Sequence, residues 1–352
     1  TAYLTTAQVA ALTSAQINKW ASDDLQAMTT AQIRALNSDQ LSNLSTDQLV
    51  LMQSKDIAAI SASQVGDLTT SAVANLTTAQ AKAINSATFN SLSSDQLAAL
   101  ETADLAVMST AQLSQLETVQ LALLSTDQVA ALSTAQVKAL TTAQLNALDS
   151  TQLAAIETAD VAVLTTAQLG SLLADSVALL STDQVAALGT AQLASLSSAQ
   201  AAALTTDQLV SLTTAQIKGL SSAQLNALSE SQLSSIETAD IAALTTTQVA
   251  KLATASVALL STDQVVALGT TQVAAMTSAQ LNALSESQLT AVETADIAAL
   301  TTAQVAKLAT ASVAMLSTDQ IVALSTSQVA AMTSVQLNAL DSAQLSAMET
   351  AD

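Results

Sequence analysis

The feature that most constrains this chain is an eight-residue repeat that runs through it without an inserted or deleted residue. Written from Thr5, the first octads read TTAQVAAL, TSAQINKW and ASDDLQAM, and the register continues to Met348 as 43 full octads with half-octads at both ends. With positions numbered p1 to p8, the consensus is Ser/Thr at p1 and p2, Ala/Asp at p3, Gln at p4, an aliphatic residue at p5, Ala at p7 and Leu at p8. Self-similarity at a fixed period indicates a repeat architecture.

The spacing of the apolar residues predicts a short helix in each octad. Residues p5 and p8 are separated alternately by three and five positions, and odd spacings would put them on opposite faces of a strand. In one continuous helix, eight residues advance by about 800°, so the apolar stripe would drift by roughly 80° per octad. Within one octad, however, p5 and p8 are i and i+3 and share a helix face.

The polar half of the octad supplies the signal that starts each helix. Ser or Thr at p1 with Gln at p4 is a capping box, in which each side chain pairs with the backbone N–H of the other residue. Examples are Ser125 with Gln128 and Thr141 with Gln144, and 26 of the 43 full octads carry this pair. We expect a separate two-turn helix in every octad. Where the favoured cap is missing, at Ala21, Gln53, Leu173, Ala253 and Ala309, we expect two helices to fuse or the corner to loosen.

The placement of charge supports the same interpretation. The net charge is −20, and 27 of the 28 acidic residues lie at p1–p4, whereas seven of the eight basic residues lie at p6 or p7. Acids near a helix N-terminus and bases near its C-terminus offset the helix dipole. This distribution predicts one helix for each octad.

Helices this short are not stable alone, so the octads must stack on one another. We therefore predict an all-α fold, an α-solenoid of short two-turn helices, one per octad, forming a single continuous array over residues 1–352. Its inner wall is expected to hold p5 and p8, and its outer wall the Ser, Thr, Gln and Asp side chains. We expect the chain to be a segment of a longer array, a processed product, or a subunit whose ends meet other copies.

A longer period is also present. Octads that open with ETAD begin at positions 101, 157, 237, 293 and 349, so that successive copies are separated by seven, ten, seven and seven octads. These intervals indicate duplication of a seven-octad block. The longer interval exceeds the others by three octads, which leads us to expect three octads in each turn of the spiral.

The same octads contain the only candidate metal ligands that the sequence offers. Each pairs a glutamate at p1 with an aspartate at p4, and oxygen-rich clusters suit Ca²⁺. Two carboxylates fall short of the six to eight ligands that Ca²⁺ takes, so we expect these acids mainly to compensate helix N-termini. The weak Ca²⁺ candidates are Glu101, Asp104, Glu157, Asp160, Glu237, Asp240, Glu293 and Asp296, with Glu349 and Asp352 as a fifth pair.

Composition argues against most other chemistry. The chain has no Cys and no His, which rules out thiolate or imidazole metal sites, a cysteine nucleophile and a Ser-His-Asp triad. We expect no enzymatic activity and no cofactor. Few and scattered Lys and Arg predict no nucleic-acid binding. No apolar run approaches the roughly 20 residues of a membrane helix, so we also expect no membrane insertion.

Runs such as STDQVAALSTAQVKALTTAQ, residues 125–144, resemble the octapeptide-repeat, low-complexity arrays of very large secreted bacterial surface proteins, adhesin-like or RTX-type. The resemblance covers the whole chain and implies export and a structural role at the cell surface. The glycine-rich calcium nonapeptides of RTX proteins are missing. We expect a non-catalytic extracellular filament or appendage subunit, or an adhesin stalk, whose partners are copies of itself. The alternative is a binding scaffold for ions such as Ca²⁺, or for ice or another surface ligand, along one polar face.

The unbroken register yields a first test. One residue inserted after Ala203 should reduce helicity or assembly far more than deletion of a whole octad, because it shifts every following helix around the spiral. Circular dichroism of the two variants measures the difference. Equal tolerance of both changes would contradict a spiral without loops.

Overall fold

A computed structural model describes residues 3–349, in which every regular element is a short α-helix and there is no strand. The all-α solenoid fold is thereby confirmed. The chain divides into two compact units, residues 1–172 and 173–352. The prediction of one continuous array over 1–352 stays a prediction. In the first unit the helices are α1 Thr6–Ala11, α2 Ser14–Ile17, α3 Ser22–Gln26, α4 Thr30–Arg34, α5 Ser38–Ser42, α6 Thr46–Leu51, α7 Ser54–Ile57, α8 Ala62–Val65, α9 Thr70–Ala74, α10 Thr78–Ala83, α11 Ser86–Phe89, α12 Ser94–Ala99, α13 Thr102–Ala106, α14 Thr110–Ser114, α15 Thr118–Ala122, α16 Thr126–Ala130, α17 Thr134–Ala139, α18 Thr142–Leu145, α19 Ser150–Ala155, α20 Thr158–Val161 and α21 Thr166–Gly170.

The second unit continues the pattern of one helix per octad. Its helices are α22 Ala174–Ala178, α23 Thr182–Ala186, α24 Thr190–Ala194, α25 Ser198–Ala203, α26 Thr206–Val210, α27 Thr214–Gly219, α28 Ser222–Leu225, α29 Glu230–Ser235, α30 Thr238–Ala243, α31 Thr246–Ala250, α32 Thr254–Ala258, α33 Thr262–Val266, α34 Thr270–Ala275, α35 Ser278–Leu281, α36 Glu286–Ala291, α37 Thr294–Ala298, α38 Thr302–Ala306, α39 Thr310–Ala314, α40 Thr318–Val322, α41 Thr326–Ala331, α42 Ser334–Leu337 and α43 Ser342–Glu349.

The helices are shorter than the expected two turns because the end of each octad and the start of the next are extended. At the corner between α17 and α18, Leu140 has φ −60° and ψ 138°, and Thr141 has φ −73° and ψ 159°. No described residue has a positive φ. The corner therefore needs neither glycine nor proline, which explains how a chain without proline changes direction at every octad.

The octads without a favoured cap keep the same corner, so the expected fusion of helices is wrong. Ala253 and Ala309 have φ and ψ of −63°, 148° and −62°, 147°, and each precedes a separate helix. Their backbone matches that of the capped octads. A contact from elsewhere in the solenoid must hold these corners, and it is described below.

The core of each unit is built from p5 and p8, as predicted. Leu105 at p5 and Met108 at p8 of one octad are 0% and 4% exposed, and the same pattern recurs in almost every octad. Phe89 replaces the aliphatic p5 residue in α11 and is fully buried. Ala at p7 is mostly half-buried, at the edge of this core.

Glutamine at p4 does not lie on the outer wall, which corrects the expectation from its polarity. Gln144, Gln184 and Gln224 are each 1% exposed, and most other p4 glutamines are buried as well. The outer surface is therefore formed by p1–p3 and p6. A buried primary amide must find hydrogen-bond partners, since leaving it unpaired is costly.

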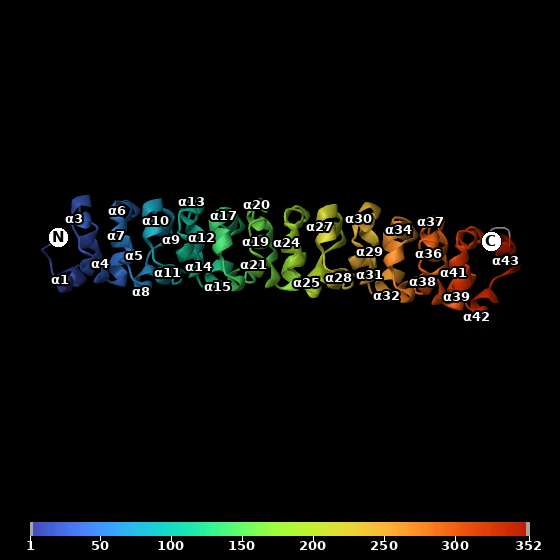
Figure 1. Cartoon of the computed structure of the whole chain (residues 1–352). Coiled ribbons are helices and arrows are strands. Elements are labelled where there is room, and N and C mark those ends of the chain that lie inside the picture. Colours follow the sequence, from blue (N-terminus) through green and yellow to red (C-terminus); the bar gives the residue numbers. More distant parts are fainter. Residues whose placement is uncertain (1–2, 350–352) are drawn as a thin grey trace. The chain divides into compact units, whose positions relative to one another are not determined.

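One turn of the spiral is longer than the expected three octads. In Figure 1, α3, α6, α10, α13, α17 and α20 follow one another along one edge of the first unit, so the step alternates between three and four helices. Helices three apart pack together, as α10 with α13, while hydrogen bonds join helices four apart across 28 residues, as from Gln136 to Met108. A turn is therefore about 28 residues, or three and a half octads, and the duplicated block of seven octads is two turns. Both copies of the block then present the same faces, which a turn of three octads would not allow.

Candidate functional site

The contact between turns depends on the glutamine at p4, and Gln144 shows its geometry. The Oε1 atom accepts the backbone N–H of Thr141 at 2.8 Å, which completes the capping box. The Nε2 atom donates to the carbonyl oxygens of Leu113 and Leu116, both at 2.8 Å, at the C-terminal end of α14. One side chain thus caps its own helix at the N-terminus and the C-terminus of a helix in the preceding turn.

This arrangement recurs through both units. The Nε2 atom of a p4 glutamine donates to the p8 carbonyl oxygen 28 residues earlier over 2.5–3.0 Å. In many octads it also donates to the p5 carbonyl oxygen 31 residues earlier. The orphan carbonyl groups at helix ends and the buried amide satisfy each other. We call this column of bonds the glutamine seam.

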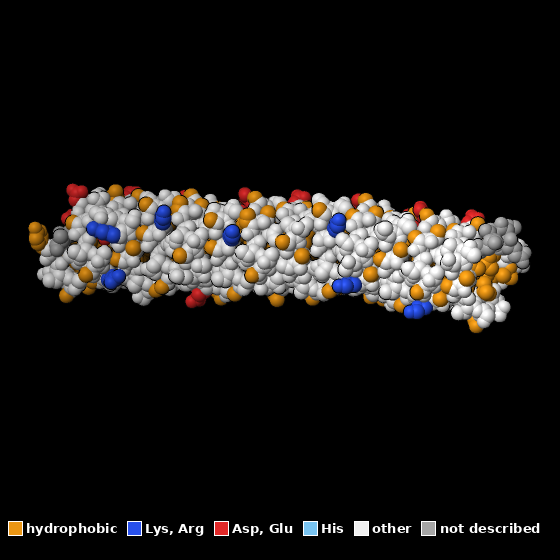
Figure 2. All heavy atoms as spheres, in the orientation of Figure 1, with side chains coloured by type: hydrophobic (Ala, Val, Ile, Leu, Met, Phe, Trp, Pro, Cys, Tyr) orange, Lys and Arg blue, Asp and Glu red, His pale blue; other side chains and the backbone are white. Residues whose placement is uncertain are grey.

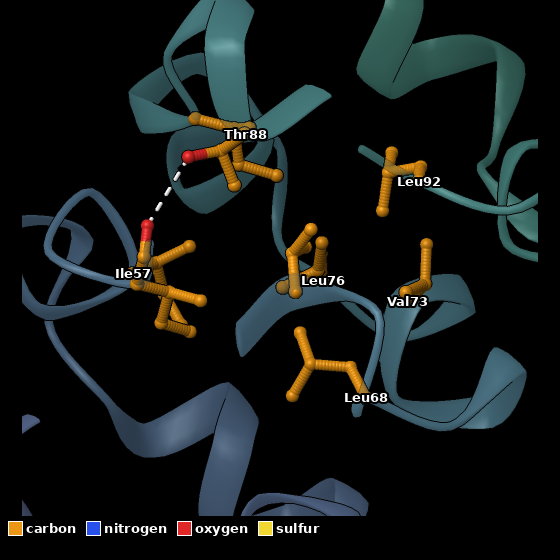
Figure 3. A pocket seen from close by; sticks show the side chains of 9 residues that line it. Ile57, Leu68, Val73, Leu76, Thr88 and Leu92 are labelled. Atoms are coloured by element: carbon orange, nitrogen blue, oxygen red, sulfur yellow. Dashed lines mark hydrogen bonds between the residues drawn. The ribbon is translucent and has the colours of Figure 1, made fainter. Parts of the chain in front are cut away.

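Octads without glutamine at p4 interrupt the seam in different ways. Thr88 keeps one bond, from its Oγ1 atom to the Ile60 carbonyl oxygen at 3.1 Å. Figure 3 shows Thr88 beside a small cavity with Ile57, Leu76 and Leu92. The cavity is about 10 Å³, which is no more than the space of one water molecule, and its lining is otherwise aliphatic. It is a packing gap next to a side chain shorter than glutamine.

Where p4 is serine, an asparagine in the preceding turn accepts the p1 N–H in place of glutamine. In α39 the p4 residue is Ser312, and the p1 N–H of Ala309 donates to Asn282 Oδ1 at 2.7 Å. The same oxygen accepts a hydrogen bond from Ser312 Oγ at 3.0 Å. Asn282 Nδ2 donates to the Lys307 carbonyl oxygen at 3.0 Å. One asparagine at p6 therefore holds the corner between α38 and α39.

The same device recurs at two further corners. Asn226 Oδ1 accepts the Ala253 N–H at 2.7 Å, and its Nδ2 donates to the Lys251 carbonyl oxygen at 2.9 Å. In the first unit, Asn90 accepts the Glu117 N–H at 3.0 Å. Sequence reasoning missed these residues, although a signal exists: Asn226 and Asn282 each precede the first residue of an uncapped octad by 27 residues.

The structure separates the paired carboxylates that were weak Ca²⁺ candidates. Glu101, Glu157, Glu237 and Glu293 are exposed at p1, while Asp104, Asp160, Asp240 and Asp296 are buried at p4. None of these glutamates caps its own helix. Within residues 3–349, no three acidic side chains come together as a metal site. Of the fifth pair, Asp352 and the side chain of Glu349 lie outside the described part of the chain.

Burial changes the acidity of two of these aspartates. Burial, and then the negative charge of Glu101, raise the pKa of Asp104 to about 6. For Asp296, burial raises the pKa, a hydrogen bond from Thr270 lowers it and the charge of Glu293 raises it, with a net increase. Asp56, in the equivalent place in α7, also has a raised pKa because of burial. At Asp56, Asp104 and Asp296 the carboxyl group is therefore held in surroundings that disfavour its charge.

Two comparisons with known proteins bear on the chain. A family model described as the ALTTAQ repeat matches residues 21–54, 97–134, 129–155, 153–190, 185–214, 233–270, 289–326 and 321–350, which together cover well over half of the chain. Comparison with curated proteins gives no match. Among the described residues, no helix is both long and apolar enough to cross a membrane.

The seam generates a direct mutational test. Gln144→Ala removes three hydrogen bonds and should lower the free energy of unfolding by about 3 kcal/mol, because the Leu116 carbonyl oxygen loses its donor and the Leu113 carbonyl oxygen keeps only backbone donors. Thr141→Ala is the matched control, since it removes only the cap hydroxyl and should cost about 1 kcal/mol. Urea unfolding compares the two variants. Equal losses would mean that the seam contributes nothing beyond the cap.

The asparagine device has its own test. Asn282→Ala should destabilise the second unit by about 2 kcal/mol, because the N–H of Ala309 and the carbonyl of Lys307 lose their partners. Adding Ser312→Gln should restore most of the loss, since glutamine at p4 accepts the p1 N–H itself. Thermal unfolding of the single and double variants gives the comparison. No rescue would show that Asn282 acts in some other way.

Proposed function

We propose that this chain, which belongs to the ALTTAQ repeat family, is a non-catalytic structural protein: the subunit of an extracellular filament or appendage, or an adhesin stalk. Its work in this proposal is mechanical. The repeated octads set a length and hold a surface or a neighbouring domain at a distance.

The glutamine seam is the observation that carries the proposal. Most octads use their p4 side chain for the same contact with the preceding turn, and almost every octad uses its p5 and p8 side chains for the same core. In a solenoid of this kind each repeat contacts only nearby repeats, so added octads increase length without changing the contacts already made. Duplication in blocks of two turns is consistent with selection for length.

An extracellular location is supported by composition and by the resemblance of the octads to secreted surface arrays. The chain has a net charge of −20 and no cysteine, so it needs no disulfide and repels other acidic surfaces. Figure 2 shows many of its carboxylates near one edge of each unit, with the lysine and arginine side chains mostly apart from them.

Copies of the same chain are the proposed partners, and exposed valines support this in the second unit. Val210, Val266 and Val322 are 48%, 42% and 45% exposed, and successive members lie seven octads apart. Because seven octads are two turns, these side chains recur on one side of that unit. A row of apolar side chains at a fixed interval suits lateral packing against a second copy with the same interval.

Negative-stain electron microscopy tests the proposal. We expect the purified chain to form filaments or bundles, and more of them near pH 4, because protonation of the carboxylates reduces repulsion between copies. The triple variant Val210→Ser, Val266→Ser, Val322→Ser should shorten or abolish bundles. Val335→Ser, which changes an exposed valine outside the row, is the matched control.

Two outcomes would contradict the proposal. Particles that stay monomeric from pH 7 to pH 4 would exclude self-assembly. Filaments that appear only after Ca²⁺ is added would favour the alternative of an ion-binding scaffold.

A further inference from the structure

We propose that two of the aspartates at p4, Asp56 and Asp104, are proton-binding sites in the glutamine seam. When protonated, each carboxyl group donates to a carbonyl oxygen of the preceding turn and closes the contact that glutamine closes elsewhere. When ionised, it leaves that contact open. At these two positions the seam is thereby tighter in mildly acidic than in neutral solution.

Glutamine at p4 supplies both an acceptor and a donor. Its Oε1 atom accepts the p1 N–H, and its Nε2 atom supplies the donor to the p8 carbonyl oxygen 28 residues earlier, as Gln136 does to Met108 at 3.0 Å. An ionised aspartate has two acceptor oxygens and no donor. In its place two acceptors would meet, which is unfavourable in a buried contact.

Asp104 shows this mismatch. It is 1% exposed, and its Oδ2 atom is buried without a hydrogen-bond partner. By the register of the other octads, the carbonyl oxygens against this side chain belong to Val73 and Leu76. No hydrogen bond from a described residue reaches the Leu76 carbonyl oxygen. A single proton on the carboxyl group would satisfy both orphan atoms.

Asp56 in α7 repeats the arrangement. One of its oxygens takes the role of the glutamine Oε1 atom, and the other lies where the glutamine Nε2 atom would be. Its Oδ2 atom accepts the Gln53 N–H at 3.3 Å, as in a capping box. Its Oδ1 atom is buried and has no partner. The register places Met28 in the position of Leu76, and the Met28 carbonyl oxygen also lacks a donor among the described residues.

The charged groups around Asp104 do not supply the missing donor. The helices packed against α13 carry Lys82 on α10, Asp127 on α16 and Lys138 on α17, and Asp95 lies in the preceding octad. In its own octad Glu101 is the other charge. Of these groups, Glu101 acts on the pKa of Asp104 and favours the protonated form, after burial, which is the larger cause.

Around Asp56 the neighbouring charges are of both signs. Lys55 lies in the same octad, Arg34 on α4 and Lys82 on α10, while Asp23 and Asp24 lie on α3 in the preceding turn. The charge of Lys55 lowers the pKa of Asp56, yet burial is the larger cause and the pKa is raised overall. Asp104, beside a glutamate, is therefore the better site to test.

The direction of the pH effect follows from the raised pKa. A carboxyl group with a pKa of about 6 in the folded chain and about 3.9 in the unfolded chain holds its proton more tightly when folded. Its contribution to stability is complete below about pH 4 and is lost as the pH rises through 6. Between pH 5 and pH 7.5, the local unfolding equilibrium constant should rise by about tenfold at Asp104.

The test uses the full chain and its Asp104→Gln variant. Amide hydrogen exchange of α13 and its neighbours, corrected for the intrinsic pH dependence, should slow about tenfold in the wild type from pH 7.5 to pH 5. In Asp104→Gln the same amides should exchange slowly at both values, because the new Nε2 atom reaches the Leu76 carbonyl oxygen. Asp127→Asn, at an exposed p3 position, is the matched control and should behave as the wild type.

Two further measurements keep the inference falsifiable. Carbon-13 titration of the Asp104 carboxyl group, identified by its loss in Asp104→Gln, should give a midpoint near 6; a midpoint near 4 would overturn the proposal. The reverse change, Gln136→Asp, should introduce the pH dependence in α17. Slower exchange in the wild type on addition of CaCl₂ or NaCl at pH 7.5, without a change in Asp104→Gln, would show that a cation rather than a proton closes the seam.

Discussion

The interaction on which the rest of this structure depends is the hydrogen bond from a buried glutamine amide to the backbone of the preceding turn. Each octad is too short to be a stable helix by itself, and two aliphatic side chains do not compensate for ordering eight residues. The p4 amide links the start of one helix to the end of another, 28 to 31 residues earlier. The absence of insertions follows, because one extra residue would displace the amides of the next turn from their carbonyl groups in the turn before it.

The corner is the second constraint, and it works with the first. Two extended residues between helices turn the chain without a positive φ, so any residue type fits the backbone. In most octads the corner is supported by an acceptor for the p1 N–H. Glutamine at p4 supplies it in most octads, and asparagine from the preceding turn supplies it at Ala253 and Ala309. An asparagine 27 residues before an octad can therefore replace its missing cap.

Much of the fold follows from the sequence, and the rest shows what local reasoning lacks. The helices, their caps and the p5/p8 core follow from spacing and capping within one octad. The position of Gln144 in the core does not, because a capping box explains its Oε1 atom and leaves its Nε2 atom unassigned. A signal was present: a capping box accepts glutamate as readily as glutamine, yet no octad has glutamate at p4. The prediction of three octads per turn was wrong because any whole number of octads preserves the register. Only contacts such as Gln136 to Met108 fix the length of a turn. The contact between turns also explains why Asp104 at p4 is buried while Glu101 at p1 is exposed.

The most direct test of the central claim is side-chain amide hydrogen exchange of the glutamines, followed by NMR on a sample with ¹⁵N in the glutamine side chains. If the seam holds the turns together, the Nε2 protons of p4 residues such as Gln144 and Gln224 exchange as slowly as the core backbone amides, while those of Gln115, at an exposed p7 position, exchange at the rate of free glutamine. Uniformly fast exchange of all glutamine side chains, with slow backbone amides, would show that the solenoid is held by its aliphatic core alone and would contradict the account.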